Sequence, residues 1–397
     1  MAKTNREGFK TVEADLDELD EKIQTHRKHI FYAVVWLVAI MVIVVVGLEL
    51  WMAVRSYDSY EVSNSIERSD SDAAKYLSFC GNIIKYSNDG IVYTDKNNEL
   101  IWNQAFEMNT PSITVCEKYL AVYDKGGSNI YIIKKDGPQK QIETTMPIET
   151  VCIAKQGTVA VLMKDGTTSY VKLYDRKGNE LANGVFYAEK GGIPIDIALS
   201  HDAQKLAVDM VSVMDGNVKS TVTFYNFGSV GQNEINNNVG VYSYADTLMP
   251  EIEYISDDRM IAVADNQIIL FTGDQKPQAE SQIFLQGDLE SVTYDDKYVA
   301  VVTHNSGNDV SYHIAIYDMK GRLMMENDSA LEYSQIEFLD NHELCLNNDY
   351  SCELYTAHGI LRFSYTFDKE IHKIMSSGVG PSYIFMLDGV TEEVRLQ

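Results

Sequence analysis

The sequence predicts an all-β protein, an eight-bladed β-propeller of four-stranded antiparallel blades preceded by one N-terminal transmembrane helix. Three observations predict it: a recurring apolar-Ala-Val tripeptide, turn residues around each copy, and one long apolar stretch near the N-terminus. The copies recur every roughly 36 to 55 residues, a period typical of propellers and solenoids. Clear and degenerate copies occupy 83–85, 120–122, 159–161, 206–208, 261–263, 299–301, 344–346 and 383–385.

Charge and cysteine content narrow the class of function. The formal net charge of the 397 residues is −25. A surface this acidic repels phosphate backbones, so we expect no nucleic-acid partner. The five cysteines are sparse and odd in number, which argues against a disulfide-dense secreted scaffold.

Residues 1–29 are predicted to form a cytoplasmic amphipathic segment. Val12, Leu16, Leu19 and Ile23 recur at spacings of four, three and four, which places them on one face of a helix. Two interpretations stay open: a short coiled-coil seam that pairs with another helix, or a solvated amphipathic helix. A seam of under two heptads is too short to be stable alone.

Residues 30–53 are predicted to form the transmembrane helix. The stretch is apolar except for Glu49, and at about 1.5 Å per residue it covers roughly 35 Å, enough to cross a hydrocarbon core of about 30 Å. A cleaved signal peptide is the alternative, but the stretch is too long for its apolar region and no small-x-small cleavage site follows. Arg27 and Lys28 lie at the inner end, which favours an N-terminus in the cytoplasm.

Residues 54–75 are predicted to be a flexible linker, because they are polar and turn-prone and carry little apolar surface. The propeller is then expected over 76–397. Its first and last repeats look incomplete. We therefore expect a strand near 76–80 to close the ring beside the C-terminal blade, and a seven-bladed ring, with the two partial repeats merged, is the alternative.

Each repeat predicts four strands. The first strand leads through a turn that is often acidic to the apolar-Ala-Val strand, which lacks polar alternation and so is expected to be buried on both faces. The third strand ends in an aromatic, Asp and Gly pattern, as at Tyr174-Asp175 with Gly178, where Asp bonds its own backbone and Gly supplies a positive φ. A more polar fourth strand completes the blade.

One segment carries a resemblance to known propellers. Ser200-His201-Asp202-Ala203-Gln204-Lys205-Leu206-Ala207 is similar to the Ser-Pro-Asp-Gly-Lys-apolar-Ala pattern of WD40-like and TolB-like bacterial propellers, with His201 in place of Pro and Ala203 in place of Gly. The whole arrangement resembles an uncharacterised bacterial family, a domain of unknown function, of single-pass membrane-anchored propellers. The resemblance implies the fold and a bacterial cell-membrane setting with the propeller outside the cytoplasm, and it implies no activity.

A search for chemistry yields few candidates. The sequence has no phosphate-binding Gly-rich loop with Lys and Ser/Thr, no HExxH, no nucleophile elbow and no CxxC. We therefore predict no catalytic, cofactor-binding or metal residue and no cofactor. Cys345 and Cys352 lie on consecutive predicted strands joined by a short turn, which makes them a candidate disulfide.

These observations favour a membrane-tethered binding or assembly platform that holds a protein partner on its loops or at the channel mouth. One alternative is an enzyme acting on envelope polysaccharide, with paired carboxylates at the channel mouth as acid and base. Another is a sensor that passes ligand binding through the anchor to the N-terminal segment. Neither the charge nor the repeats indicate an oligomeric state.

Overall fold

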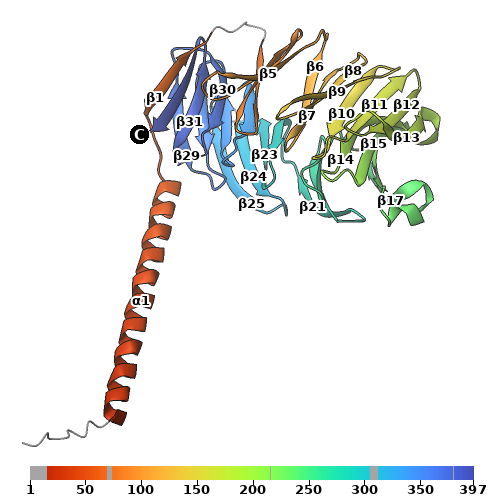
Figure 1. Ribbon diagram of the computed structural model, residues 1–397. Coiled ribbons are helices and arrows are strands. Elements are labelled where there is room, and N and C mark those ends of the chain that lie inside the picture. The colour runs from red at the N-terminus through yellow and green to blue at the C-terminus, as the bar shows by residue number, and fades with distance from the viewer. Residues whose placement is uncertain (1–15, 69–73, 215, 305–311, 379) are drawn as a thin grey trace, which may run out of the picture. The chain divides into compact units, whose positions relative to one another are not determined.

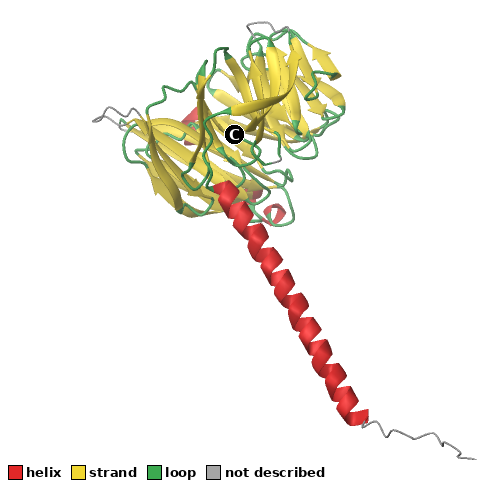
Figure 2. Cartoon of the chain, turned by 90° about the vertical axis from the view of Figure 1, so that its left-hand side faces the viewer, coloured by secondary structure: helices red, strands yellow, loops and turns green. Residues whose placement is uncertain are grey.

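The structure is a computed structural model that describes residues 16–68, 74–214, 216–304, 312–378 and 380–397. The chain divides into two compact units, one through Arg55 and one from Ser56 to Gln397. Figure 2 shows that the second unit is built almost wholly of strands joined by loops. Each unit is described by itself.

The first unit is dominated by one helix, α1 (Leu16–Ala53). Its segment 21–45 has a mean hydropathy of 2.3 and none of its most apolar window is buried, so by length and composition it can cross a membrane. Leu16, Leu19 and Ile23 belong to the same helix, which joins the amphipathic and apolar stretches without interruption. Val12 lies outside the described residues.

In the second unit, the described residues form eight four-stranded antiparallel sheets, which confirms the eight-bladed propeller and excludes the seven-bladed alternative. Figure 1 follows them along the chain by colour. Blades 1 to 4 contain β2 (Lys75–Phe79), β3 (Asn82–Ser87), β4 (Gly90–Thr94), β5 (Leu100–Ala105); β6 (Pro111–Cys116), β7 (Tyr119–Asp124), β8 (Asn129–Lys134), β9 (Gly137–Glu143); β10 (Ile148–Ile153), β11 (Val159–Asp165), β12 (Thr168–Tyr174), β13 (Glu180–Tyr187); and β14 (Ile193–Leu199), β15 (Lys205–Met214), β16 (Asn217–Asn226), β17 (Asn238–Ala245).

Blades 5 to 8 complete the ring, and the last blade combines strands from both ends of the unit. They contain β18 (Glu251–Tyr254), β19 (Arg259–Val263), β20 (Gln267–Thr272), β21 (Gln278–Phe284); β22 (Leu289–Tyr294), β23 (Tyr298–His304), β24 (Tyr312–Asp318), β25 (Leu323–Ser329); β26 (Gln335–Phe338), β27 (Leu344–Asn347), β28 (Ser351–Tyr355), β29 (Leu361–Thr366); and β30 (Ile371–Ser376), β31 (Ser382–Leu387), β32 (Val390–Leu396) with β1 (Tyr60–Glu67).

The recurring tripeptides lie in the second strand of every blade, as predicted. In five blades the middle residue is alanine, and each is completely buried: Ala121, Ala160, Ala207, Ala262 and Ala300. Separate apolar clusters fill the seams between neighbouring blades, including the seam where Ile83 of blade 1 packs with Met375 and Ile384 of blade 8. A small residue at the centre of the second strand lets two neighbouring sheets approach closely there.

The structure corrects the predicted linker and the predicted closing strand. β1 pairs antiparallel with β32 over residues 60–67, inside the segment expected to be flexible, and lies beside the C-terminal strands (Figure 1). The strand near 76–80 is instead β2, the first strand of blade 1. β1 escaped prediction because an outermost strand buries little: most of its residues are exposed, and backbone pairing with Tyr60 as an anchor holds it.

Three short helices lie around blade 4. α2 (Ala188–Gly191) connects blades 3 and 4, while the 3-10 turns η1 (Gly231–Asn233) and η2 (Ile235–Asn237) interrupt the connection between β16 and β17. Asn236 and Asn237 both have a positive φ, of 54° and 60°. Asparagine tolerates this conformation better than most residues, which explains the Asn-rich turn.

Candidate functional site

The turns between first and second strands interlock on one side of the ring. The Lys155 ammonium lies 2.9 and 2.7 Å from the two carboxylate oxygens of Asp257. The backbone N–H of Lys155 donates to the His201 carbonyl at 2.9 Å. His201 Nε2 lies 3.1 Å from the Tyr254 carbonyl oxygen. Contacts of this kind tie blades 3, 4 and 5 together, so these turns form a rigid rim.

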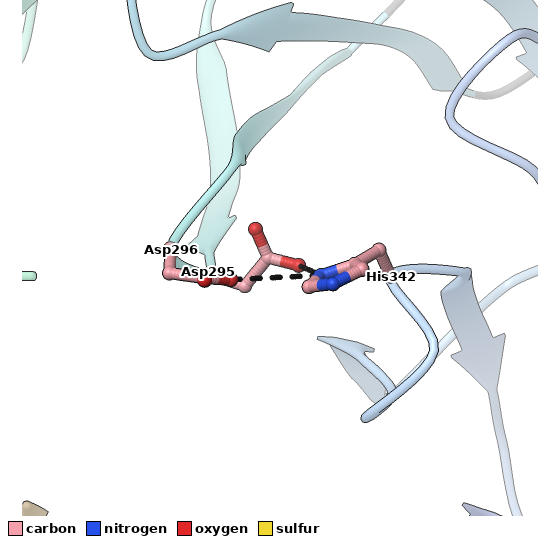
Figure 3. Close-up of side chains that lie close together, drawn as sticks. All are labelled: Asp295, Asp296 and His342. Atoms are coloured by element: carbon pink, nitrogen blue, oxygen red, sulfur yellow. Dashed lines mark hydrogen bonds and ion pairs between the residues drawn. The ribbon is translucent and has the colours of Figure 1, made fainter. Parts of the chain in front are cut away.

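On the next part of this rim, Asp295, Asp296 and His342 converge from the turns of blades 6 and 7 (Figure 3). His342 Nδ1 lies 2.6 Å from Asp295 Oδ2 and 3.6 Å from Asp296 Oδ1. The Lys297 ammonium is 2.8 Å from the other ring nitrogen, Nε2, and Asp295 Oδ1 accepts two backbone N–H bonds. These contacts join the turns of blades 6 and 7, so the group forms a clasp between two blades.

Asp295 and Asp296 lie in one of the acidic turns that the sequence predicts between first and second strands, whereas His342 was not predicted. The two segments are 47 residues apart and have no shared motif, so only the ring brings them together. His342 has a positive φ of 63° in the tight turn of blade 7, a conformation that is uncommon for residues other than glycine but that histidine adopts more readily than most.

A pair of carboxylates does lie on an inner strand. The Tyr294 hydroxyl is 2.5 Å from Glu251 Oε1 and 3.2 Å from Glu253 Oε2. Glu251 and Glu253 are both exposed to solvent. The inner strands of blades 2 to 5 gather around Glu253, and the resulting desolvation, followed by the Glu251 charge, raises the pKa of Glu253 to about 7. The cavity that these strands share with Glu253 measures about 10 Å³, which is at the lower limit for a single water molecule.

Two more carboxylates lie in the seam between blades 4 and 5. Asp196 and Asp209 are paired across β14 and β15, so their side chains share a face. Asp196 Oδ2 accepts the Ile252 N–H at 2.8 Å, whereas Asp209 is completely buried and neither of its oxygens has a side-chain or backbone hydrogen-bond partner among the described residues. Burial is the main cause that raises the pKa of Asp209 to about 7, and the negative charge of Asp196 raises it further.

Two larger cavities lie between neighbouring blades, and a third lies on blade 1. Cavities of about 650, 440 and 230 Å³ are lined in part by the outer strands of blades 3, 5 and 1, respectively. The first is here named the blade 3–4 groove. Its lining contains no Asp, Glu, Lys, Arg or His; it consists of Val171, Leu173, Leu181, Ala182, Asn183, Gly184, Val185, Phe186, Leu206, Tyr225, Phe227, Gln232, Asn236 and Asn237.

The candidate disulfide cysteines are both buried with free thiols. They lie on adjacent strands as expected, but Cys345 is opposite Leu354 and Cys352 is opposite Asn347. This diagonal offset separates Cα atoms by about 7–8 Å, beyond the usual span of a disulfide, so oxidation would require movement of the backbone. The disulfide stays a prediction, and the register is unfavourable to it.

Comparisons with known proteins agree with this architecture. A family model described as a family of unknown function (DUF5711) matches residues 53–396. The comparison with curated proteins gives no match.

Solved structures of similar fold are distant in sequence. The C-terminal WD40 domain of Sif2 is 12% identical, with 86% of this chain and 99% of that chain covered and a TM-score of 0.54. Sqt1 from Chaetomium thermophilum is 13% identical, with 85% and 100% covered and a TM-score of 0.50. BamB from Moraxella catarrhalis is 12% identical, with 85% and 100% covered and a TM-score of 0.48. At these identities the likeness shows the fold alone.

Proposed function

Because the chain belongs to the DUF5711 family of unknown function, we propose its role from its own architecture: a membrane-tethered β-propeller that acts as a protein-binding platform in the bacterial cell envelope. In this proposal 30–53 crosses the membrane, 1–29 lies in the cytoplasm and the propeller lies outside it. The basic residues Arg27 and Lys28 before the apolar stretch support that orientation.

The observation that carries the proposal is where the cavities lie. The cavity at Glu253 measures about 10 Å³, whereas cavities of about 650 and 440 Å³ lie between blades at the outer strands. Ligand sites of enzymes usually offer roughly 300–1,000 Å³ around the reacting groups. A propeller whose larger cavities open between blades at the outer strands is suited to holding a partner rather than to enclosing a substrate.

The polysaccharide-enzyme alternative meets one of its two requirements. Glu251 and Glu253 lie within reach of one hydroxyl, and a carboxyl with a raised pKa suits a general acid. The second requirement is room for a sugar ring beside both groups, whereas the cavity at Glu253 measures about 10 Å³ and is not lined by Glu251. Replacement of Glu253 by Gln should therefore leave the cellular role of the protein intact.

Two measurements test the platform. A reporter that functions only outside the cytoplasm, fused after Gln397, should be active, and its inactivity would overturn the orientation. Lysine-directed crosslinking in native membranes, followed by purification of the full chain, should recover the same partner protein in every preparation. Recovery of the chain alone each time would overturn the platform.

Deletion of residues 1–25 tests the sensor alternative. The platform expects unchanged recovery of the partner, whereas the sensor alternative expects loss of the phenotype.

A further inference from the structure

We propose that the blade 3–4 groove and the adjoining strand β13 form a docking site for an extended, uncharged segment of the partner, which adds to β13 as a further strand. This inference rests on the proposed function and identifies the surface and the chemistry that it uses. Three features carry it: an open strand edge, an uncharged lining and a flat aromatic floor.

The first feature is the open edge of β13. This strand is the outermost in blade 3, and its outer edge over 181–186 has no backbone hydrogen bond to another described segment. Six extended residues offer about 20 Å of edge. Unpaired N–H and C=O groups in a row are a template for an added strand.

Most outer strands of this propeller carry the usual protection against such addition, a charged or proline residue within the strand. Examples are Lys140 in β9, Glu280 in β21 and Glu326 in β25. β13 has no charged residue or proline between 181 and 186. β5 and β17 also lack charged residues and proline, but the cavity beside β5 includes Lys85 and Asp89, and none of the cavities described above is lined by β17.

The second feature is the uncharged lining, which is unusual in a chain of net charge −25. The amides of Gln232 and Asn236 are exposed at the groove, and hydrogen bonds to either side chain are absent among the described contacts. Amides can bond a peptide backbone or a small polar side chain, whereas a charged side chain entering the groove would lose hydration without gaining a counter-ion. The groove therefore selects an uncharged segment.

The third feature is the aromatic floor. The Phe186 ring folds over Gly184, where an added Cβ would lie 3.3 Å from the ring. Tyr225 and Phe227 are half-buried beside the apolar cluster of this seam. Flat rings with accessible faces bind apolar side chains at little cost in conformational entropy. Alternate side chains of an added strand can pack on this floor while the others point outward.

The direct test uses the full chain in detergent micelles and a fluorescent peptide of about eight alternating threonine and valine residues, read by fluorescence anisotropy. The peptide should bind. A version with proline at alternate positions should bind about tenfold more weakly or worse, because it lacks the N–H groups. A version with lysine in place of valine should also bind more weakly, although the acidic chain attracts cations in general.

Two exposed positions provide matched variants. Val185→Lys places a charge on β13, where the side chain is 44% exposed, and should weaken binding about tenfold or more. Leu100→Lys makes the same change on β5, where the side chain is 61% exposed, and should leave binding unchanged. Equal binding of the valine and proline peptides, tighter binding of the lysine peptide, or no effect of Val185→Lys would each overturn the inference.

The two proposals fail separately. If membrane crosslinking recovers a partner but no peptide binds at β13, the platform stands and this docking site is wrong. If an uncharged oligosaccharide such as cellotetraose binds, loses affinity in Phe186→Ala, and the peptides do not bind, the groove is a saccharide site instead. If the peptide binds but no partner is recovered, the edge is open and the platform is wrong.

Discussion

The edge of blade 8 and the edge of blade 3 differ in what covers them. Blade 8 has three strands of its own, and β1 from the start of the unit adds to the β32 edge as the fourth. Blade 3 has its four strands, and its outer strand β13 remains uncovered. Among the described residues, strand addition therefore completes blade 8, whereas the edge of β13, uncharged over 181–186, stays open.

The closed edge shows what holds an added strand. β1 is mostly polar and exposed, but Tyr60 packs among Phe363, Phe367 and Phe385 with ring centroids 5.3 to 6.4 Å apart. The adjoining seam between blades 7 and 8 contains two ion pairs, Arg362 with Glu343 and Lys373 with Glu337. A few packed side chains together with backbone hydrogen bonds are enough to hold an added strand. The open edge of β13 and the aromatic side chains of the blade 3–4 groove offer a partner the same two kinds of contact.

The seam between blades 7 and 8 is called the closing seam below. The largest effect on stability is expected when a buried carboxylate in this seam loses its cation. Arg362 Nε lies 3.1 Å from Glu343 Oε1, without the alignment of a hydrogen bond, and both side chains are about nine-tenths buried. Arg362→Met should lower the free energy of unfolding by about 3–5 kcal/mol, because it leaves the Glu343 charge without its cation. Urea denaturation measures this change.

Arg322→Met is the matched control, since Arg322 also pairs with a carboxylate but its side chain is 72% exposed. This change should cost less than about 1 kcal/mol. Equal losses in the two variants would show that burial does not set the strength of the closing seam.

The opposite effect is expected at Asp209, on the far side of blade 4 from the groove. Its pKa is raised from 3.8 to about 7, so the folded state holds a proton that the unfolded state releases between these two values. Stability should therefore fall as pH rises from about 4 to 7 and then level off. Asp209→Asn should raise the free energy of unfolding at pH 8 by up to ~4 kcal/mol, and by much less at pH 5.

Urea denaturation of Asp209→Asn and the unchanged chain at these two pH values makes the comparison. A variant that is no more stable than the unchanged chain at pH 8 would mean that the buried carboxylate has a partner in solution, such as a bound cation. The seam between blades 4 and 5 would then resemble the paired closing seam.

A smaller loss is expected when the closing strand loses its anchor. Tyr60 is half-buried, so Tyr60→Ala should cost about 2 kcal/mol, below the range for a fully buried aromatic residue. Hydrogen exchange should become faster in β1 and β32 and stay unchanged in β13. Faster exchange spread evenly over all blades would contradict a locally anchored strand.

The smallest effect is expected at the rim. Lys155 and Asp257 pair at 2.7 Å, but their side chains are 37% and 43% exposed. A double-mutant cycle with alanine at both positions should give a coupling of at most about 1 kcal/mol, reduced by salt. A coupling as large as the loss in Arg362→Met would mean that the rim, rather than the buried closing seam, holds the ring.

Sequence reasoning recovered the repeating part of the fold because each second strand is buried on both faces and its pattern is local. It missed β1, whose polar residues Ser63 and Asn64 are typical of a linker, because an outer strand is recognised only by the partner it pairs with. The contacts of the candidate site are likewise non-local. Asp295 and His342 meet only once blades 6 and 7 are stacked, and Asp196 faces Asp209 only through the register of the β14–β15 pair within blade 4.

The register of the β27–β28 hairpin could not be predicted from the sequence either. Cys345 and Cys352 were placed on the correct neighbouring strands, but the turn between them sets the pairing two residues away from an opposed pair. Turn length and conformation decide register, and the sequence of this turn does not specify one type.

Site-specific photocrosslinking in native membranes tests the central claim most directly. A photoreactive phenylalanine analogue at Val185 on β13 and, in a separate chain, at Leu100 on β5 compares two exposed positions in uncharged stretches of outer strands. The account predicts one discrete partner at Val185, joined through an extended uncharged segment identified by mass spectrometry, and none at Leu100. No adduct at Val185, or the same adducts at both positions, would contradict it.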